Sequence, residues 1–250
     1  MTTKDNLKNF YNSEAKKYYA TRNKPRSDGQ WIINEIKNSQ KKEISILEFG
    51  CGWWRCIQHI KNNLPWIKIN YIWIDLSDEL LKYAQKDNPK LKFICDDISN
   101  YIKNVKQESF DFIIWIASFQ HIPTYGERLF LMKHFYRCLK YWWKIIMTNR
   151  AMSKWFIKKY KKEITLSCLK SIYTFWKHSW RDLQIPRKNS GEIKYRYYHI
   201  FSKKELSTLA NEWWFLTHTL IYLDKKWKDC TSRQSANNTL LIGTKWIYKQ

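Results

Sequence analysis

Short apolar runs alternate with amphipathic stretches through the middle of the chain, and this pattern leaves few folds open to it. The runs are rich in isoleucine and aromatic residues, which favour buried strands. They occupy residues 44–49, 67–74, 91–95, 110–116 and 144–148. Parallel strands need crossover connections, which are usually helices. The sequence therefore predicts an α/β fold in which a parallel sheet is covered by helices.

The stretches between the runs carry helix signals. Residues 77–86 have leucine and alanine at helical spacing. Thr124 and Glu127 have the spacing of a capping box, and Ser202 and Glu205 repeat it later in the chain. A helix is predicted to begin at each of these places.

The alternation breaks in the last hundred residues. Residues 151–200 are aromatic and basic, as expected of a substrate-recognition insertion after the fifth strand. Residues 215–223 and 239–244 are apolar and β-rich, so they predict a closing antiparallel pair of strands.

A glycine-containing turn follows the first predicted strand. Glu48 is followed by Gly50 and Gly52, and only glycine lets the backbone approach a nucleoside cofactor closely. Asp75 ends the second strand, where a ribose diol needs an acceptor, and Asp96 and Asp97 end the third. Three acidic strand ends at one sheet edge indicate a cofactor site.

Together these residues resemble the class I S-adenosyl-L-methionine-dependent methyltransferases. The resemblance implies a Rossmann-like fold, with a mostly parallel seven-stranded sheet, helices on both faces and an insertion after the fifth strand. It implies S-adenosyl-L-methionine as cofactor. The cofactor-binding residues that it implies are Glu48, Gly50, Cys51, Gly52, Trp54, Asp75, Leu76, Asp96, Asp97 and Ile116.

The same resemblance divides the chain into four segments. Residues 1–43 form an N-terminal helical segment, and residues 44–150 form the cofactor-binding core. Residues 151–200 are the substrate-recognition insertion. Residues 201–250 supply a helix and the closing antiparallel strands of the same domain.

Further segments are similar to the tRNA methyltransferases that esterify 5-carboxymethyluridine at the wobble position. These are Thr21-Arg22 to Pro25, Ile116 to His121, and Arg196-Tyr-Tyr-His199. This likeness implies Arg22, His121, Arg196 and His199 as catalytic residues that orient the substrate carboxylate. A carboxylate is already ionised at neutral pH, so methyl transfer to it requires no general base.

The charge balance predicts a polyanionic partner. Lys and Arg number 45 against 22 Asp and Glu, a net charge of +23. The resemblance makes the anticodon stem-loop of tRNA the expected partner; a small activating subunit, which eukaryotic members use, leaves no sign in the sequence. AT-rich coding also enriches lysine regardless of function, so a methyltransferase of a quinone, lipid or carboxylic acid stays open as an alternative. A non-catalytic RNA-binding relative is the second alternative, for the case that Trp54 prevents cofactor binding.

The remaining sequence signals predict a cytoplasmic chain. The N-terminus has no apolar signal segment, and the apolar run at 112–119 is too short to span a bilayer. Six cysteines occur without a Cys-x-x-Cys pair, so we expect reduced thiols and no metal.

Tryptophan stands where the resembled class has glycine. The chain has 15 Trp and 6 Gly, whereas average usage predicts roughly 18 Gly. Trp54 falls on the third glycine of the cofactor motif, and Trp73, Trp142-Trp143 and Trp214 fall on other glycine positions. We hypothesise that UGA codons of the gene encode glycine.

A second codon reassignment, in which arginine CGN codons natively encode tryptophan, would explain three arginines. Arg26, Arg150 and Arg187 stand where the tRNA-modifying family tends to have tryptophan. CGA or CGG codons at these sites would support a native tryptophan, and AGA codons would count against it.

The glycine hypothesis predicts that tryptophan at 53 and 54 obstructs the cofactor. We expect a Trp53→Gly/Trp54→Gly variant to bind S-adenosylhomocysteine at least about tenfold more tightly, because a strained, bulky turn no longer blocks the methionine portion. Equilibrium titration of both chains measures this. Equal affinity, or UGG codons at 54, 73 and 143, would contradict the hypothesis.

Overall fold

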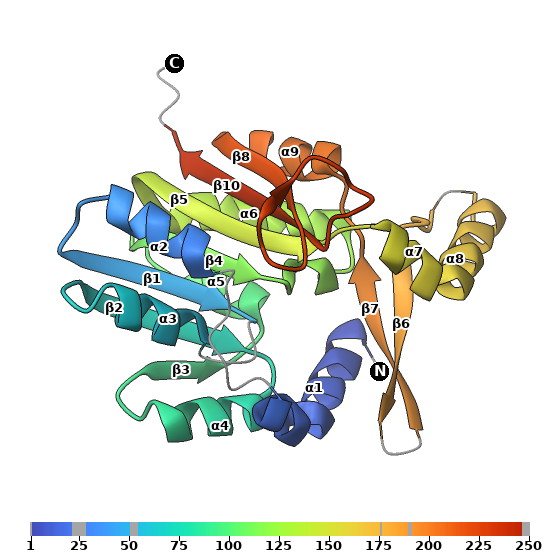
Figure 1. Cartoon of the computed structure of the whole chain (residues 1–250), viewed down its shortest axis with the longest axis horizontal. Helices are drawn as coiled ribbons and strands as arrows, with labels where there is room; N and C mark the ends of the chain where they lie inside the picture. Colours follow the sequence, from blue (N-terminus) through green and yellow to red (C-terminus); the bar gives the residue numbers. More distant parts are fainter. Residues whose placement is uncertain (1, 22–28, 51–54, 176, 190–191, 247–250) are drawn as a thin grey trace.

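A computed structural model describes residues 2–21, 29–50, 55–175, 177–189 and 192–246 of the chain. Its main sheet has the strand order β3-β2-β1-β4-β5-β10-β8-β9 within these ranges (Figure 1). The strands are β1 (Glu43–Phe49), β2 (Lys68–Asp75), β3 (Lys92–Cys95), β4 (Phe110–Ile116), β5 (Leu139–Arg150), β8 (Phe215–Leu223), β9 (Asp229–Cys230) and β10 (Asn238–Lys245). The strands β1 to β5 pair in parallel, and β10 pairs antiparallel with both β5 and β8. The predicted class I methyltransferase fold is confirmed, but the sheet has eight strands among the described residues and not seven, because the two-residue strand β9 pairs with β8.

Helices cover both faces of the sheet because its strands alternate between two apolar layers. In β1, Ile44 and Ile46 point to one layer while Leu47 and Phe49 point to the other. The first layer is covered by α2 (Gly29–Asn38), α3 (Arg55–Asn63) and α4 (Asp78–Asp87). The second is covered by α5 (Ile98–Asn104), α6 (Tyr125–Cys138) and α9 (Lys203–Asn211). No helix within the described ranges is long and apolar enough to cross a membrane.

Of the two capping boxes predicted from the sequence, the first is complete in the structure and the second is formed only in part. Thr124 and Glu127 form the complete capping box at the start of α6. Ser202 accepts from the backbone N–H of Glu205 at the start of α9, as predicted. The carboxylate of Glu205 does not complete the second box, because its Oε1 lies 2.7 Å from Nε2 of His199.

The segment after β5 folds as a unit beside the main sheet. It consists of α7 (Lys154–Lys159), α8 (Lys161–Tyr173), β6 (Asp182–Asn189) and β7 (Glu192–His199). Strands β6 and β7 pair as an antiparallel hairpin. The helix α1 (Thr3–Thr21) packs against α4 and β7, so the N-terminal helix and the insertion meet over one edge of the sheet (Figure 1).

Several tryptophans occupy backbone conformations that favour glycine. Trp142, Trp214 and Trp227 have φ values of 72°, 54° and 62°, in the left-handed region that side chains with a Cβ rarely adopt. The indole N–H groups of Trp73, Trp115 and Trp213 are buried and have no hydrogen-bond partner among the described residues. The positive φ of Trp142 and Trp214 and the unpaired indole of Trp73 support the hypothesis that these three positions encode glycine.

The strained backbone predicts that glycine stabilises the fold at position 142 in β5 and at position 214 in the turn before β8. Trp142 and Trp214 are exposed, so their replacement loses little packing. We expect Trp142→Gly and Trp214→Gly each to raise the free energy of unfolding by about 1 kcal/mol. Trp66 is also exposed but has no positive φ, so Trp66→Gly should lower it by about 0.5–1 kcal/mol. Urea denaturation of the three variants measures this, and a loss of stability at 142 and 214 would contradict it.

Candidate active site

A cavity of about 600 Å³ opens at the carboxyl edge of the parallel strands, a volume typical of ligand sites. The sheet edge contributes Gly50, Asp75, Leu76, Asp96 and Ile116 to its lining. The other walls come from α1, from α7 and from the β6–β7 hairpin. The cavity therefore lies between the nucleotide-binding edge of the sheet and the insertion.

Gly50 fits tightly at the end of β1. Its φ is +58°, and a Cβ built on it would lie 2.8 Å from Oγ of Ser118. Its backbone N–H donates to the carbonyl of Ile74 at 2.9 Å. A side chain at position 50 would thus push apart β1 and the residues after β4, which explains the glycine.

Two acidic side chains lie at the sheet edge where the cofactor resemblance requires them. Asp75 is 7% exposed and accepts from the N–H of Ser77 at 2.9 Å. Asp96 lines the same cavity and accepts from the N–H of Asp97 at 2.7 Å. Carboxylates held in this way suit the hydroxyl groups of a ribose and the amino group of an adenine. The residues present therefore fit S-adenosyl-L-methionine.

Not every residue of the predicted cofactor set lines the cavity. Glu48 is fully buried and accepts from the hydroxyl of Tyr71. Asp97 caps α5 by accepting from the N–H of Ser99, and its Oδ2 pairs with Lys4 at 2.7 Å. Both carboxylates support the neighbouring chain segments. The predicted residues Cys51, Gly52, Trp54 and Arg22 lie outside the described residues.

His121 lies in the cavity wall as a neutral imidazole. Its Nδ1 is 2.8 Å from the carbonyl of Tyr197, which can only accept, so Nδ1 carries the proton. Its Nε2 then accepts from the hydroxyl of Tyr11 at 3.0 Å. Burial, together with the charge of Arg196, lowers the pKa of His121 to about 3. His121 orients Tyr11 rather than carrying charge.

Arg196 presents a cation to the cavity from β7. Its Nη1 lies 3.3 Å from the hydroxyl of Tyr18 and 3.5 Å from that of Tyr11. Its guanidinium carbon lies 4.7 Å from the ring centre of Phe10 and 5.2 Å from that of Tyr198. Its Nε is buried without a hydrogen-bond partner, and no carboxylate among the described residues pairs with it. An anionic ligand in the cavity would supply the missing partner.

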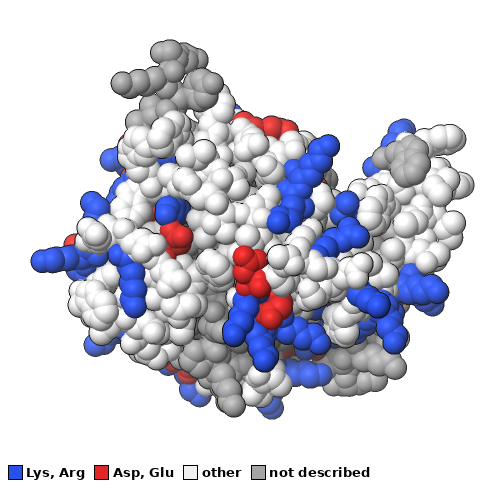
Figure 2. Space-filling model, turned by 45° about the horizontal axis from the view of Figure 1, so that its top comes forward, with Lys and Arg blue, Asp and Glu red and all other residues white. Residues whose placement is uncertain are grey.

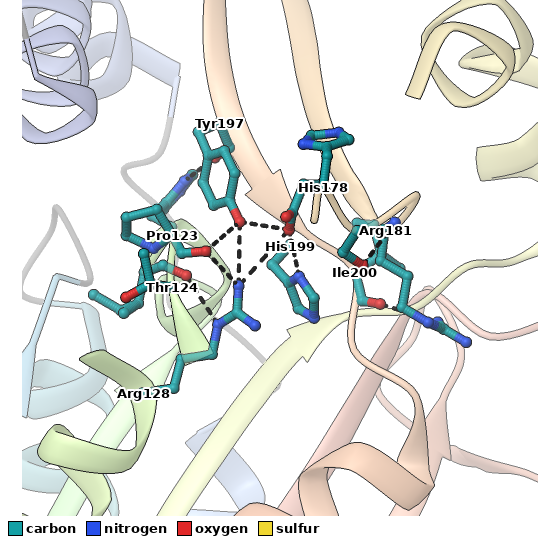
Figure 3. A network of polar contacts seen from close by, with 12 residues as sticks. Pro123, Thr124, Arg128, His178, Arg181, Tyr197, His199 and Ile200 are labelled. Atoms are coloured by element: carbon teal, nitrogen blue, oxygen red, sulfur yellow. Dashed lines mark hydrogen bonds and ion pairs between the residues drawn. The ribbon is translucent and has the colours of Figure 1, made fainter. Parts of the chain in front are cut away.

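The third described catalytic candidate, His199, does not line the cavity. Its Nδ1 lies 2.6 Å from Asp182 and its Nε2 lies 2.7 Å from Glu205. Arg128 lies 3.4 Å from Glu205 and 3.8 Å from Asp182, which completes the ion cluster. Figure 3 shows Arg128 and His199 of this cluster together with Tyr197. Burial acts to raise the pKa of Asp182, but hydrogen bonds from His199 and Tyr197 outweigh it and leave that pKa lowered. We therefore assign His199 to this cluster.

The alternation of side chains along β7 explains why the motif at residues 196–199 contributes both to the cavity and to the ion cluster. Successive side chains of a strand point to opposite faces. Arg196 and Tyr198 line the cavity, whereas Tyr197 and His199 contact the ion cluster on the other side. The four consecutive residues therefore supply both the site and its support.

Two of the three arginines that would be tryptophan under the second reassignment, Arg150 and Arg187, are described by the structure. Nε of Arg187 lies 2.9 Å from Oε2 of Glu14, whose side chain is fully buried. A tryptophan at 187 would leave this buried carboxylate without its cation, which counts against reassignment there. Arg150 lines the cavity and lies over the ring of Trp155. Arg26 lies outside the described residues.

Sequence reasoning did not single out Tyr11 and Tyr18. Both line the cavity from α1, and their hydroxyls contact Arg196. Their spacing of seven residues places them on one side of the helix, which was an available signal. Nothing in the local sequence indicated that this side faces the cavity.

Comparison with known proteins agrees with this geometry. Residues 46–141 match a family model described as a methyltransferase domain. A malonyl-[acyl-carrier protein] O-methyltransferase from Ilyobacter polytropus is 32% identical over 122 residues, which is 48% of this chain and 42% of that protein. The corresponding Priestia megaterium protein is 32% identical over 123 residues, which is 48% of this chain and 43% of that one. The chain thus spans less than half the length of these curated relatives.

Solved structures show the same fold. A methyltransferase from Methanosarcina mazei aligns with a TM-score of 0.65 at 18% identity, covering 85% of this chain and 97% of that one. One from Clostridium acetobutylicum aligns with a TM-score of 0.64 at 15% identity, covering 95% and 100%. The chain therefore has the class I methyltransferase fold, and its residues 46–141 match a methyltransferase domain, for which S-adenosyl-L-methionine is the methyl donor.

The lowered pKa of His121 predicts a specific loss of stability in acid. The unfolded chain binds a proton at this residue as the pH falls through its ordinary value of 6.5, whereas the folded chain does not until about 3. Stability is therefore lost with falling pH across this window, by up to about 1.4 kcal/mol per pH unit. We expect His121→Gln to show a shallower loss than the parent in urea denaturation between about pH 7 and about pH 4.

The matched control is His218→Gln, because His218 is exposed on β8. This variant should keep the slope of the parent protein. Equal slopes for the His121→Gln chain and the parent would show that His121 titrates in the folded state.

Proposed function

We propose that the chain transfers the methyl group of S-adenosyl-L-methionine to a carboxylate oxygen of an acid. The new bond joins the methyl carbon to the carboxylate oxygen, and the bond from the methyl carbon to sulfur breaks. The products are a methyl ester and S-adenosylhomocysteine. The observation that carries this proposal is the guanidinium of Arg196, which faces the cavity without a carboxylate partner among the described residues.

The charges of the cavity differ between its two sides. Asp75 and Asp96 lie at the sheet edge, where the cofactor's ribose and adenine are expected. Arg187 and Arg196 lie on the hairpin side, and among the described residues Glu14 pairs with Arg187. A substrate between the cofactor and the hairpin therefore meets an uncompensated positive charge. A carboxylate complements it, and a guanidinium can bind both carboxylate oxygens.

The surroundings of Arg196 favour positioning over proton transfer. Its stacking on Phe10 and its contact with Tyr18 fix the plane of the guanidinium. His121 is neutral, and its Nε2 is occupied by the hydroxyl of Tyr11. Transfer to an ionised carboxylate needs orientation and exclusion of water but no base. The side chains present match that requirement.

The relatives support a small or carrier-bound acid. Both are named for O-methylation of a malonyl group, and a malonyl group offers a carboxylate oxygen. Neither name mentions tRNA. We therefore favour the carboxylic-acid alternative from the sequence over tRNA as the substrate.

Esterification of the tRNA wobble uridine remains a second candidate function because of the charge of the protein. Lysine and arginine outnumber acidic residues on the face in Figure 2, and the net charge is +23. Such a surface attracts nucleic acid. The acceptor in this case is the carboxylate of 5-carboxymethyluridine, so the chemistry at Arg196 is the same.

The proposal predicts a base-labile methyl ester and a dependence on Arg196. We expect Arg196→Gln to lower kcat/KM for the acid by about 100-fold, because a charged hydrogen-bond partner of the carboxylate is lost. Arg196→Lys should recover part of it. Affinity for S-adenosylhomocysteine should stay unchanged in both variants. The Trp53→Gly/Trp54→Gly chain provides the parent if cofactor binding requires it.

Transfer of labelled methyl groups is measured with three acceptors: a malonyl thioester, free dicarboxylic acids, and bulk tRNA from a strain lacking the gene. Label in the thioester or acids supports the first choice, and label in tRNA supports the second. Label that resists mild alkali would contradict carboxylate methylation. Unchanged kcat/KM in Arg196→Gln would contradict the role of this arginine.

A further inference from the structure

The helix α8 buries small polar side chains and exposes large apolar ones, which is the reverse of the usual arrangement. It buries Ser167 and Ser171, which are 6% and 1% exposed. Leu166, Leu169 and Ile172 point outward at 55%, 58% and 61% exposed. Burial of apolar area stabilises proteins. If this effect alone set the orientation of α8 on the protein, the leucine and isoleucine side chains would point inward and the serines outward.

The contacts of the buried side explain how this orientation is held. Oγ of Ser167 donates to the carbonyl of Asp182 at 2.7 Å and lies 3.0 Å from Nε2 of His178. Ile164, near the start of α8, packs on the small apolar cluster of Met152, Phe156, Leu183, Ile185 and Ile200. The orientation is therefore fixed by contacts with β6, and the apolar side of α8 is left outside.

The exposed apolar face extends beyond the end of α8. Tyr173 is 86% exposed and Phe175 is 87% exposed. We call Leu166, Leu169, Ile172, Tyr173 and Phe175 the α8 face. These residues lie on α8 and just after it, and Figure 1 places α8 at the part of the insertion that is farthest from the main sheet. Contiguous exposed apolar residues of this kind mark an interaction surface.

Lysines border the α8 face. Lys161, Lys162, Lys170 and Lys177 are exposed, and none has an ion pair with any described residue. Glu163 is the acidic residue that α8 contributes. An apolar face bordered by lysines complements a surface that is apolar inside and anionic outside.

We propose that the α8 face docks on an anionic lipid surface. Apolar and aromatic side chains enter the boundary between headgroups and acyl chains, while lysines reach the anionic headgroups. A bilayer accepts an exposed apolar helix face without a preformed groove. A second copy of the chain fits less well, because each carries a net charge of +23. RNA is disfavoured because three of the five side chains of the α8 face, those of Leu166, Leu169 and Ile172, can neither stack on a base nor contact a phosphate.

The position of α8 connects this surface to the cavity. Trp155, Lys159 and Tyr160 line the cavity, and α8 begins at the next residue, Lys161. Docking of α8 therefore brings one wall of the cavity close to the lipid surface. The proposal does not depend on methyl transfer, because its test measures binding alone.

Binding of the full chain to vesicles tests the proposal. Flotation compares vesicles of phosphatidylcholine alone with vesicles that also contain phosphatidylglycerol, at low and at physiological salt. We expect binding to the mixed vesicles. The Leu169→Ser/Ile172→Ser variant should bind at least about tenfold more weakly, because two inserted apolar side chains are lost. Lys161→Gln/Lys162→Gln should also weaken binding and reduce its salt dependence.

The matched control is Leu216→Ser, which makes the same chemical change at a leucine that is 44% exposed on β8 in the main sheet. This variant should bind like the parent. The α8 variants should keep the melting temperature, because the substituted side chains are exposed. Light scattering of the free protein should report a monomer at the concentrations used.

Three outcomes would overturn the proposal. The first is failure of the parent to bind anionic vesicles at low salt. The second is equal binding by Leu169→Ser/Ile172→Ser, which would assign binding to net charge alone. The third is a parent dimer that the double variant converts to a monomer, which would assign the α8 face to a second copy of the chain.

Discussion

The substrate side of the cavity depends on the partly buried ion cluster of Arg128, Asp182, His199 and Glu205. These side chains come from α6, β6, β7 and α9, so their mutual attraction holds the insertion against the core. Buried charges are costly to leave unpaired, so each member requires the others. Because the cluster fixes one face of β7, the opposite face directs Arg196 into the cavity. The site is therefore a consequence of how β7 is anchored.

Much of the fold was predictable because its signals are local. The apolar runs that became β1 to β4 and the acids Asp75 and Asp96 at their ends follow from periodicity and from the rule that parallel strands end at a common edge. The domain boundaries stay predictions. The closing strands β8 and β10 pair antiparallel, as their composition indicated. Residues at the cofactor edge were predictable for the same reason.

The substrate side was less predictable because it is assembled from distant segments. Tyr11 and Tyr18 reach Arg196 from α1, across more than 170 positions of sequence. His199 belonged to the same motif as Arg196, yet the two point to opposite faces of β7. The sequence of the motif gave no indication of which face meets the cavity. That choice is made by Asp182 and Glu205, which bind His199 from other elements.

Two kinds of unfavourable residue remain in the structure: residues with a strained backbone and apolar residues exposed to solvent. Different changes would remove the energetic cost of each. At Trp142 and Trp214 the cost lies in the backbone, where φ is positive. A binding partner does not change the cost of a Cβ in that conformation, so only a different residue removes it. At Leu169 and Ile172 the cost lies in exposure. A partner relieves exposure without any change of residue. The tryptophans therefore point to how the gene is read, whereas the α8 face points to what the protein touches.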